Sequence, residues 1–302
     1  MRSPQIRARG RQAFTLTELL LVIAIIAVLA SLISAAVMRA RTRMREVACR
    51  TEIAQLEDAL QTFHTKFNFY PPSRMIICER YDQYFAGPAT NPQFISPLHQ
   101  LSAQTLERMF PRAVDQWRAT GIDWNGDGTL TPPVALEGHQ CLVFFLGGVP
   151  TASDPPACQG FASGPDPTAA TMTDRIKPYF EFQADRLRRN PTNRFLVYLD
   201  THNLAPYAFF SAGKSHNGYV LTDCAGISSS FSGQVPCNVP KPYRVNATEF
   251  WRADNWQIIS AGADGKFGTS LTTWGAASLY KKGDPGFDDQ ANFTANLLST
   301  RP

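Results

Sequence analysis

The chain has 302 residues, the length of one large domain or of two average domains. Hydrophobic residues make up 44% of it and aromatic residues 11%, so a packed core can form and a wholly disordered chain is excluded. The formal net charge is only +4. This balance argues against the concentrated basic surface of a general nucleic-acid-binding protein, and we expect no nucleic-acid partner.

A long apolar segment lies close to the N-terminus. Residues 19–38 read LLLVIAIIAVLASLISAAVM, in which Ser31 and Ser34 are the only polar members. In a helix this segment is about 30 Å long, which matches the hydrocarbon core of a bilayer. A cleaved secretory signal also has a basic start, but this run is longer than usual and lacks a convincing small-x-small cleavage site. The segment therefore predicts one membrane-spanning helix, with the lipid bilayer as a partner.

Basic residues flank the apolar segment on both sides. Four arginines precede it and four follow it: Arg2, Arg7, Arg9, Arg11, Arg39, Arg41, Arg43 and Arg45. The orientation of a span follows the excess of basic residues on the cytoplasmic side, so this near-equal balance leaves the orientation open.

A specific motif joins the basic start to the apolar segment. Residues 11–23 read RQAFTLTELLLVI, so Glu18 follows Phe14 by four positions. The pattern resembles the class III signal of type IV pilins and type II secretion pseudopilins: a basic leader, a cut before Phe, Glu as fifth mature residue and an unbroken apolar helix. The resemblance implies that prepilin peptidase cuts between Ala13 and Phe14 and that Phe14 becomes N-methylated. Ala13 replaces the family's usual Gly and Gly10 lies three residues earlier, but the Phe-to-Glu spacing favours the cut after Ala13.

Glu18 is an isolated carboxylate at the start of the apolar segment. An ionised side chain in hydrocarbon costs about 2.5–3.5 kcal/mol on insertion scales, so it is rare unless it has a partner. Cleavage would create such a partner, the free amine of Phe14. The resemblance implies that Glu18 meets the N-terminal amine of an adjacent subunit and sets the axial register of a homo-oligomeric filament. The alternative is that Glu18 reaches the lipid headgroups and has no specific role.

The helical pattern continues beyond the membrane segment. Apolar residues recur at steps of four and three on one helix face: Cys49, Ile53, Leu56, Leu60, Phe63 and Phe67. A Tyr-Pro-Pro sequence at 70–72 ends the pattern, so we expect one helix from Phe14 to about Thr65. Residues 51–60 and the Tyr-Pro that follows look like the major pseudopilin of type II secretion, in which a similar helix meets a similar turn.

The resemblance implies a chain of four parts. These are a leader at 1–13, a membrane-spanning helix half at 14–38, an amphipathic helix half at 39–67 and a periplasmic globular head at 68–302. The expected fold class is α+β, with the long N-terminal helix packed on an antiparallel β-sheet head of pilin-like type that carries large loop insertions.

Within the head, only some segments have a clear secondary-structure pattern. Segments 194–199, 206–211 and 218–222 have the composition of strands with turn residues between them. Residues 141–146 are continuously apolar, which leaves a strand and a buried helix both open. Residues 147–173 are rich in Gly, Pro, Ser and Thr and predict an inserted loop.

The end of the head carries an acidic pattern. Residues 256–268 read WQIISAGADGKFG, a strand that runs into a glycine loop, and DPGFDDQANF follows at 284–293. Major pseudopilins of type II secretion end with a similar strand, an Ala-Asp-Gly turn and a distal acidic pair, and their loop holds one calcium ion. The resemblance implies calcium bound by Asp264 and by Asp288 or Asp289. The alternative is an Asp-Gly turn with solvated acids.

A second candidate calcium site lies in the middle of the chain. Residues 123–130 read DWNGDGTL and match the first half of an EF-hand loop, with Gly at the sixth position. The oxygen ligands at alternate positions would be Asp123, Asn125 and Asp127. Val134 occupies the twelfth position, where a bidentate Glu is expected, and Glu137 comes three residues late. The alternative is a plain surface turn.

Six cysteines are present, an even number, and disulfides persist if the head lies outside the cytoplasm. The preferred bridge joins Cys224 and Cys237, and the next joins Cys141 and Cys158. Cys49 lies on the apolar stripe and has the pattern of a small hydrophobic core residue.

No catalytic motif is evident. The sequence lacks a Gly-x-Ser-x-Gly elbow, a P-loop and an HExxH motif. Five scattered histidines have the pattern of structural or solvated residues: His64, His99, His139, His202 and His216. We therefore expect no enzyme, and the alternative is a membrane-anchored periplasmic hydrolase.

The resemblance as a whole implies a pseudopilin of type II secretion, a structural subunit in protein transport. It would be a single-pass inner-membrane protein with a cytoplasmic N-terminus and a periplasmic head, and it would be extracted into a periplasmic filament. Its partners would be prepilin peptidase, other pseudopilin subunits and the inner-membrane secretion platform. A type IV pilus subunit for adhesion, motility or DNA uptake shares the N-terminal features, and only the C-terminal acidic loop and the Tyr-Pro turn favour secretion.

Overall fold

The structure is a computed structural model. It describes residues 15–85, 96–169, 174–227, 237–268, 273–275, 280–295 and 297–299, without the side chain of Ala35. The chain divides into two compact units, Met1–Arg45 and Glu46–Pro302. Ala13 and Phe14 lie outside the described residues, so the predicted processing site has no structural account.

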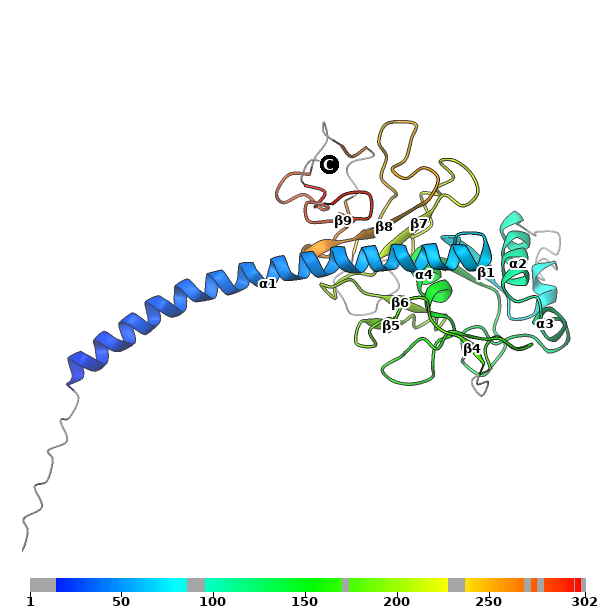
Figure 1. Ribbon diagram of the computed structural model, residues 1–302, viewed down its shortest axis with the longest axis horizontal. Coiled ribbons are helices and arrows are strands. Elements are labelled where there is room, and N and C mark those ends of the chain that lie inside the picture. Colours follow the sequence, from blue (N-terminus) through cyan, green and yellow to red (C-terminus); the bar gives the residue numbers. More distant parts are fainter. Residues whose placement is uncertain are drawn as a thin grey trace, which may run out of the picture. The chain divides into compact units, whose positions relative to one another are not determined.

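One helix, α1 (Leu16–Phe67), runs through the predicted membrane segment and continues beyond it (Figure 1). Among the described residues it is the helix long and apolar enough to cross a membrane, with a mean hydropathy of 3.0 over its most apolar 18-residue window and none of that window buried. Asn68 ends it with a φ of +57° and donates its backbone N–H to the His64 carbonyl oxygen at 2.7 Å. This left-handed residue is a common way to close a helix, and it places the end two residues beyond the predicted Thr65.

The apolar stripe on the second half of α1 is buried as predicted. The sixth member, Phe67, is partly buried and packs against the core cluster. The other five are at most 3% exposed: Cys49, Ile53, Leu56, Leu60 and Phe63. The Phe63 ring meets the rings of Phe145 and Tyr179 at centroid separations of 5.7 and 5.6 Å. The stripe is thus covered by a helix and loops as well as by strands, because Phe145 belongs to a helix.

That helix, α4 (Gly138–Gly147), is buried at every position. Of the two predictions left open for residues 141–146, a strand and a buried helix, the helix is therefore confirmed. It follows β2 (Val134–Glu137), which pairs antiparallel with β1 (Arg74–Ile77). A Cβ on Gly138 would lie 1.8 Å from the Phe209 carbonyl oxygen, so only glycine permits the first turn of α4 to pack this closely on its neighbour. A helix that is apolar on all sides has no amphipathic period, so the sequence could not distinguish it from a buried strand.

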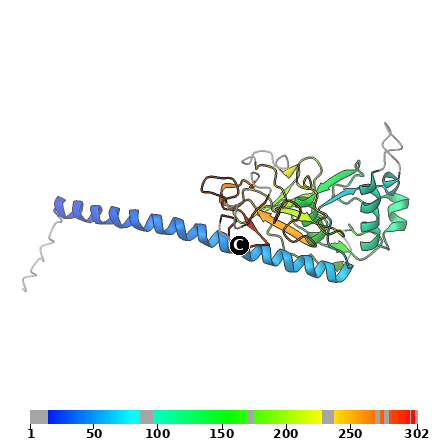
Figure 2. The same ribbon diagram turned by 90° about the horizontal axis from the view of Figure 1, so that it is seen from above.

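The largest sheet separates two parts of the core. It has three antiparallel strands in spatial order, β7 (Ala208–Ser211), β8 (Trp256–Ser260) and β9 (Gln290–Ala291). Alternate side chains point to opposite faces of a strand. Phe209, Trp256 and Ile258 join the cluster that includes the α1 stripe and α4. Phe210 and Ile259 join a second cluster formed with the C-terminal segments. Figure 2 shows β8 running beside the second half of α1.

The remaining elements are short. They are η1 (Tyr81–Tyr84), α2 (Pro97–Met109), α3 (Val114–Thr120), β3 (Phe161–Ala162), β4 (Arg175–Ile176), β5 (Leu187–Arg189), β6 (Leu196–Tyr198) and η3 (Gly262–Asp264). β3 pairs with β4 and β5 with β6, both antiparallel. The head therefore holds several small antiparallel sheets, and the fold is α+β, consistent with a pilin-like fold.

Two of the three predicted head strands are confirmed, since β6 lies within 194–199 and β7 within 206–211. The third is wrong: residues 218–220 are irregular and 221–222 lie in a turn, in which the Asp223 N–H reaches the Val220 carbonyl oxygen at 3.3 Å. Val220 and Leu221 are 50% and 41% exposed, so the apolar pair that indicated a strand is not part of the core. In the predicted loop 147–173, the described residues after α4 contain only the two-residue strand β3.

Candidate functional site

Glu18 lies in the first turn of α1 and forms a reciprocal cap with Thr15. The Thr15 N–H and hydroxyl donate to Glu18 Oε2 at 3.0 and 2.8 Å, and the Glu18 N–H donates to the Thr15 Oγ1 at 3.3 Å. This is a capping box, which satisfies N–H groups that the start of a helix leaves without partners. The structure therefore gives Glu18 a local role that the sequence analysis did not consider. Thr15, which holds the Glu18 carboxylate, directly follows Phe14 in the sequence.

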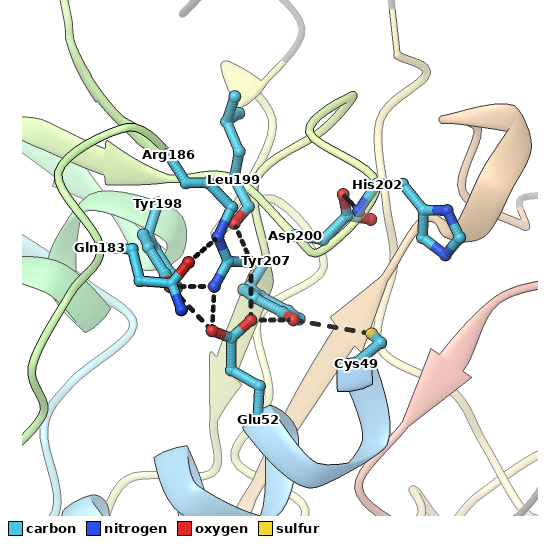
Figure 3. A network of polar contacts seen from close by, with 9 residues as sticks. All are labelled: Cys49, Glu52, Gln183, Arg186, Tyr198, Leu199, Asp200, His202 and Tyr207. Atoms are coloured by element: carbon cyan, nitrogen blue, oxygen red, sulfur yellow. Dashed lines mark hydrogen bonds and ion pairs between the residues drawn. The ribbon is translucent and has the colours of Figure 1, made fainter. Parts of the chain in front are cut away.

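A buried polar network fixes the second half of α1 to the head, and Glu52 is its centre (Figure 3). Both Glu52 and Arg186 are 7% exposed. The Arg186 guanidinium donates to both Glu52 oxygens, with Nη1 at 2.9 Å from Oε2. The hydroxyls of Tyr198 and Tyr207 donate to the same carboxylate at 2.7 and 2.6 Å. Four donated hydrogen bonds thus compensate a carboxylate that has lost its water.

The electrostatics of this network keep Arg186, Tyr207 and Cys49 protonated at neutral pH. Burial acts to lower the pKa of Arg186, but the hydrogen bonds and the charge of Glu52 outweigh it, so the pKa of Arg186 is raised overall. Burial, with the charge of Glu52, raises the pKa of Tyr207 well above its ordinary value. Burial also raises the pKa of the Cys49 thiol to about 11. The network therefore contains no activated nucleophile, because the thiol and the phenols stay protonated at neutral pH.

Asp200 lies next to this network and is fully buried (Figure 3). Its Oδ2 accepts a hydrogen bond from the Ser260 hydroxyl at 2.7 Å, and its Oδ1 accepts one from the His202 N–H at 3.1 Å. Burial raises the pKa of Asp200 to about 7, and the hydrogen bonds offset only part of that effect. Asp200 is thus a group in the core whose charge changes near neutral pH.

A second attachment joins α1 to the C-terminal segment. Glu57 Oε1 accepts a hydrogen bond from Asn292 Nδ2 at 2.9 Å and pairs with Arg252 Nη2 at 3.0 Å. Asn292 also accepts the Ile258 N–H and donates to the Trp256 carbonyl oxygen, so it links the edge of β8 to the helix. Sequence reasoning did not single out Glu52 or Glu57. Glu52 did carry a signal, because it lies three residues after Cys49 and directly before Ile53, on the apolar face of the helix.

The structure brings the predicted acids of the C-terminal loop together. Asp288 Oδ2 accepts the backbone N–H of Ala263 and that of Asp264, the latter at 3.0 Å, so the distal pair reaches the turn through Asp288. Gly262 has a φ of +66°, and a Cβ there would lie 2.4 Å from the Asp288 carbonyl oxygen. Burial raises the pKa of Asp264, and the nearby charge of Asp288 adds to the effect.

Asp289 points to a different set of partners. It is fully buried, and its Oδ2 accepts the Gly268 N–H at 2.9 Å and the Tyr243 hydroxyl at 3.1 Å. Its Oδ1 is buried and has no hydrogen-bond partner among the residues that the structure describes. Burial raises the pKa of Asp289 well above its ordinary value, and the charges of Asp288 and Asp264 contribute to the rise. In the described part of the chain, no three His, Cys, Asp or Glu side chains converge as they stand into a group that could hold a metal. The calcium assignment stays a prediction.

The middle loop with the second candidate ligands is compact. Asp123 Oδ1 accepts the Gly126 N–H at 2.8 Å, Asn125 Oδ1 accepts the Asp127 N–H at 2.9 Å, and Asp127 Oδ1 accepts the Thr129 N–H at 2.8 Å. The three predicted ligands thus lie in one turn and hold its backbone.

The cysteines differ from the predicted pairing. All six lie within the described residues and are free thiols, so neither Cys224–Cys237 nor Cys141–Cys158 is bridged. The Cys224 thiol packs at Gly138 and donates to the Phe209 carbonyl oxygen at 3.4 Å. The Cys158 thiol packs against Gly147, at the far end of α4. Six residues of helix separate Gly147 from Cys141, a rise of about 9 Å, whereas a disulfide requires Cα atoms about 4.4–6.8 Å apart.

The histidines considered as catalytic candidates have separate environments. His64 stacks on Tyr70 with ring centroids 4.1 Å apart. His216 Nδ1 lies 2.7 Å from Asp254, at the surface. Burial lowers the pKa of His139 to about 3. None of these arrangements points to a reaction, and the expectation that the protein is not an enzyme stays a prediction.

Comparison with known proteins yields one match. Residues 8–34 match the family model of the prokaryotic N-terminal methylation motif. No curated protein and no solved structure matches the chain. This motif, which is the type IV pilin-like signal, implies processing by prepilin peptidase and assembly with other pilin subunits, and with α1 it fits a single-pass membrane-anchored protein. The chain therefore carries the N-terminal signal of prepilins and is supported as a pilin-like or pseudopilin subunit in general.

Proposed function

We propose that the protein is a pseudopilin of type II secretion, which enters a short periplasmic filament after prepilin peptidase removes residues 1–13. The observation that carries the proposal is the match of residues 8–34 to the methylation motif, with Glu18 four positions after Phe14. Because α1 presents an exposed apolar surface over its first half, it suits both a bilayer and the core of a helical filament. In this proposal the N-terminus is cytoplasmic and the head is periplasmic.

Mass spectrometry of the mature N-terminus tests the class of protein. The expected product begins with N-methylated Phe14. When prepilin peptidase is deleted, the uncleaved full-length precursor should accumulate instead. The four-residue spacing between Phe14 and Glu18 assigns the cut to the bond between Ala13 and Phe14. A Gly10→Ala variant should therefore be processed normally, whereas Phe14→Asp, which changes a residue at that bond, should not. A mature protein that still begins at Met1 would contradict the proposal.

The C-terminal loop and the Tyr-Pro turn after α1 are the features that favour secretion over a type IV pilus. Deletion of the chain should leave exported substrates of the secretion system trapped in the periplasm, while pilus-dependent motility, adhesion and DNA uptake continue. The reverse pattern would assign the protein to a pilus. No role as a hydrolase is included in the proposal, and the purified protein should leave model esters, peptides and glycans unchanged.

We further propose that calcium binds the C-terminal loop. Calcium takes six to eight oxygen ligands, and this loop offers the carboxylates of Asp264 and Asp288 together with backbone carbonyls. The buried, unpartnered Oδ1 of Asp289 fits a nearby cation, since a cation would offset the charge that burial disfavours. The bound ion would fix the loop against β8. Thermal unfolding of the full chain should shift upward with calcium, and Asp264→Asn should remove most of the shift.

A further inference from the structure

The loop at 123–131 is wound around its first aspartate. Asp123 Oδ2 accepts the Gly128 N–H at 2.7 Å, and Oδ1 accepts the N–H groups of Gly126 and Asp127 at 2.8 and 3.2 Å. Gly126 and Gly128 have φ values of +68° and +83°, which only glycine adopts readily. The side-chain oxygens of Asp123, Asn125 and Asp127 therefore accept backbone N–H groups of the loop and hold it in a compact turn.

A carboxylate from elsewhere in the chain closes this loop. Glu79 follows β1, and its backbone carbonyl oxygen accepts the Ile122 N–H at 2.8 Å, directly before Asp123. Its side-chain Oε2 accepts the N–H and the hydroxyl of Thr131, the latter at 2.8 Å. Glu79 therefore contacts the loop at both ends, although 52 positions separate it from Thr131.

The other oxygen of Glu79 accepts no hydrogen bond from the described residues. Glu79 is 2% exposed, and its Oε1 is buried without a partner in that part of the chain. A buried acceptor without a donor is unfavourable, because it has lost its hydrogen bonds to water. Burial raises the pKa of Glu79, and the charges of Asp123 and Asp127 contribute to the rise. Arg194 lies near enough to Asp127 to act on its pKa and offsets part of this negative charge.

Glu137, which the sequence offers as a late substitute for the missing twelfth ligand, faces elsewhere. Its Oε2 accepts the Gly226 N–H at 2.6 Å. Glu79, and not Glu137, is thus the acid from outside the loop that contacts both of its ends.

We propose that residues 123–131 and Glu79 form a second calcium site, in which Glu79 supplies the carboxylate that the loop itself lacks. Asp123, Asn125 and Asp127 supply side-chain oxygens, and Thr129, at the seventh position, supplies its backbone carbonyl, as in an EF-hand loop. As the side chains stand, no three acids of the described residues form a metal group, so binding requires Asp127 to turn from Thr129 towards the ion. The site ties the segment after β1 to the loop before β2, and it does not depend on the filament proposal.

Terbium luminescence tests this site in the full-length protein in detergent. Terbium binds the same oxygen ligands as calcium, and Trp124, which lies between Asp123 and Asn125 in the loop, would sensitise it. All variants carry Asp288→Asn, so that failure of the C-terminal calcium site cannot affect the result. We expect terbium emission on excitation of tryptophan and its displacement by calcium. Even outer partners of metal ligands contribute about 10- to 100-fold to affinity, so Glu79→Gln should weaken calcium binding by at least about tenfold.

Two further variants sharpen the comparison. Asp127→Asn, at a partly exposed position, should weaken binding to a similar extent, and it carries the test if Glu79→Gln fails to fold, as judged by circular dichroism in EDTA. Glu137→Gln, which removes the acid nearest in sequence to the twelfth position, should leave calcium affinity unchanged. The proposal is overturned if the Asp288→Asn protein binds no calcium at millimolar concentration, or if folded Glu79→Gln and Asp127→Asn bind as tightly as Glu137→Gln.

Discussion

The carboxylate of Glu52 and the guanidinium of Arg186 form an ion pair beneath the surface of the head, although 134 positions separate them in the chain. Glu52 belongs to α1, and Arg186 directly precedes β5. A pair buried at this depth gives little net stability by itself, because both charges lose their water, but removal of one member leaves the other uncompensated.

Arg186→Ala should therefore destabilise the protein by about 3–5 kcal/mol. Urea unfolding of the full chain in detergent, followed by tryptophan fluorescence, measures the change. Arg80→Ala is the matched control, because Arg80 pairs with Asp82 where both side chains are more than 60% exposed. That exposed pair should contribute less than about 1 kcal/mol. Equal effects of the two substitutions would show that the buried pair does not hold α1.

Glu18 has a capping role and a proposed pairing role, and two variants separate them. Glu18→Gln keeps an acceptor for the Thr15 N–H, since Gln also serves in a capping box, but it removes the charge. Thr15→Ala removes the hydroxyl and keeps the carboxylate. If the charge pairs with the amine of a neighbouring subunit, Glu18→Gln should be inserted and cleaved yet enter filaments about tenfold less. Thr15→Ala should assemble normally. Quantification in sheared filaments decides, and normal assembly of Glu18→Gln would exclude the charge pairing.

Asp200 should make stability depend on pH. Its pKa is about 7 in the folded protein, against an ordinary value of 3.8, so the folded state binds the proton more tightly than the unfolded state. The stabilisation from protonated Asp200 is complete below about pH 4 and is lost as the pH rises through 7, by an amount of the order of a few kcal/mol. Asp200→Asn removes this term, so the variant should gain stability relative to the wild type between pH 4.5 and 8. Urea unfolding of both proteins at pH 4.5 and at pH 8 measures the difference in their free energies of unfolding. A difference that is the same at both pH values would contradict the pKa shift.

Gly262 should be far less replaceable than Gly213. Both have left-handed φ values, +66° and +65°, but a Cβ at Gly213 meets nothing within 4 Å, whereas one at Gly262 meets the Asp288 carbonyl oxygen at 2.4 Å. Gly213→Ala should cost about 1–2 kcal/mol from the backbone alone. Gly262→Ala should cost clearly more, because it also displaces Asp288 from η3. Unfolding of the two variants side by side tests the difference, which would vanish if the loop shifts freely.

The sequence predicts what depends on neighbouring residues and fails where distant ones meet. The stripe from Cys49 to Phe63 repeats with the period of a helix, so its buried face is readable without a structure. The donors to Glu52 come from a segment more than 130 positions away, and Glu79 meets a loop more than 40 positions beyond it. No local pattern records such pairings. The strand predicted at 218–222 failed for a related reason, because apolar composition does not reveal that Val220 and Leu221 face solvent.

The two attachments of α1 have a mechanical consequence. Glu52 and Glu57 are five residues apart, a rise of about 7.5 Å along the helix, and they hold separate parts of the chain, Arg186 on one side and Arg252 with Asn292 on the other. A force along the helix axis would act on the contacts of Glu52 and of Glu57 at the same time. The two sets of contacts would therefore share the load, and they would not break one after the other. Extraction of the helix from the head would require both to rupture together.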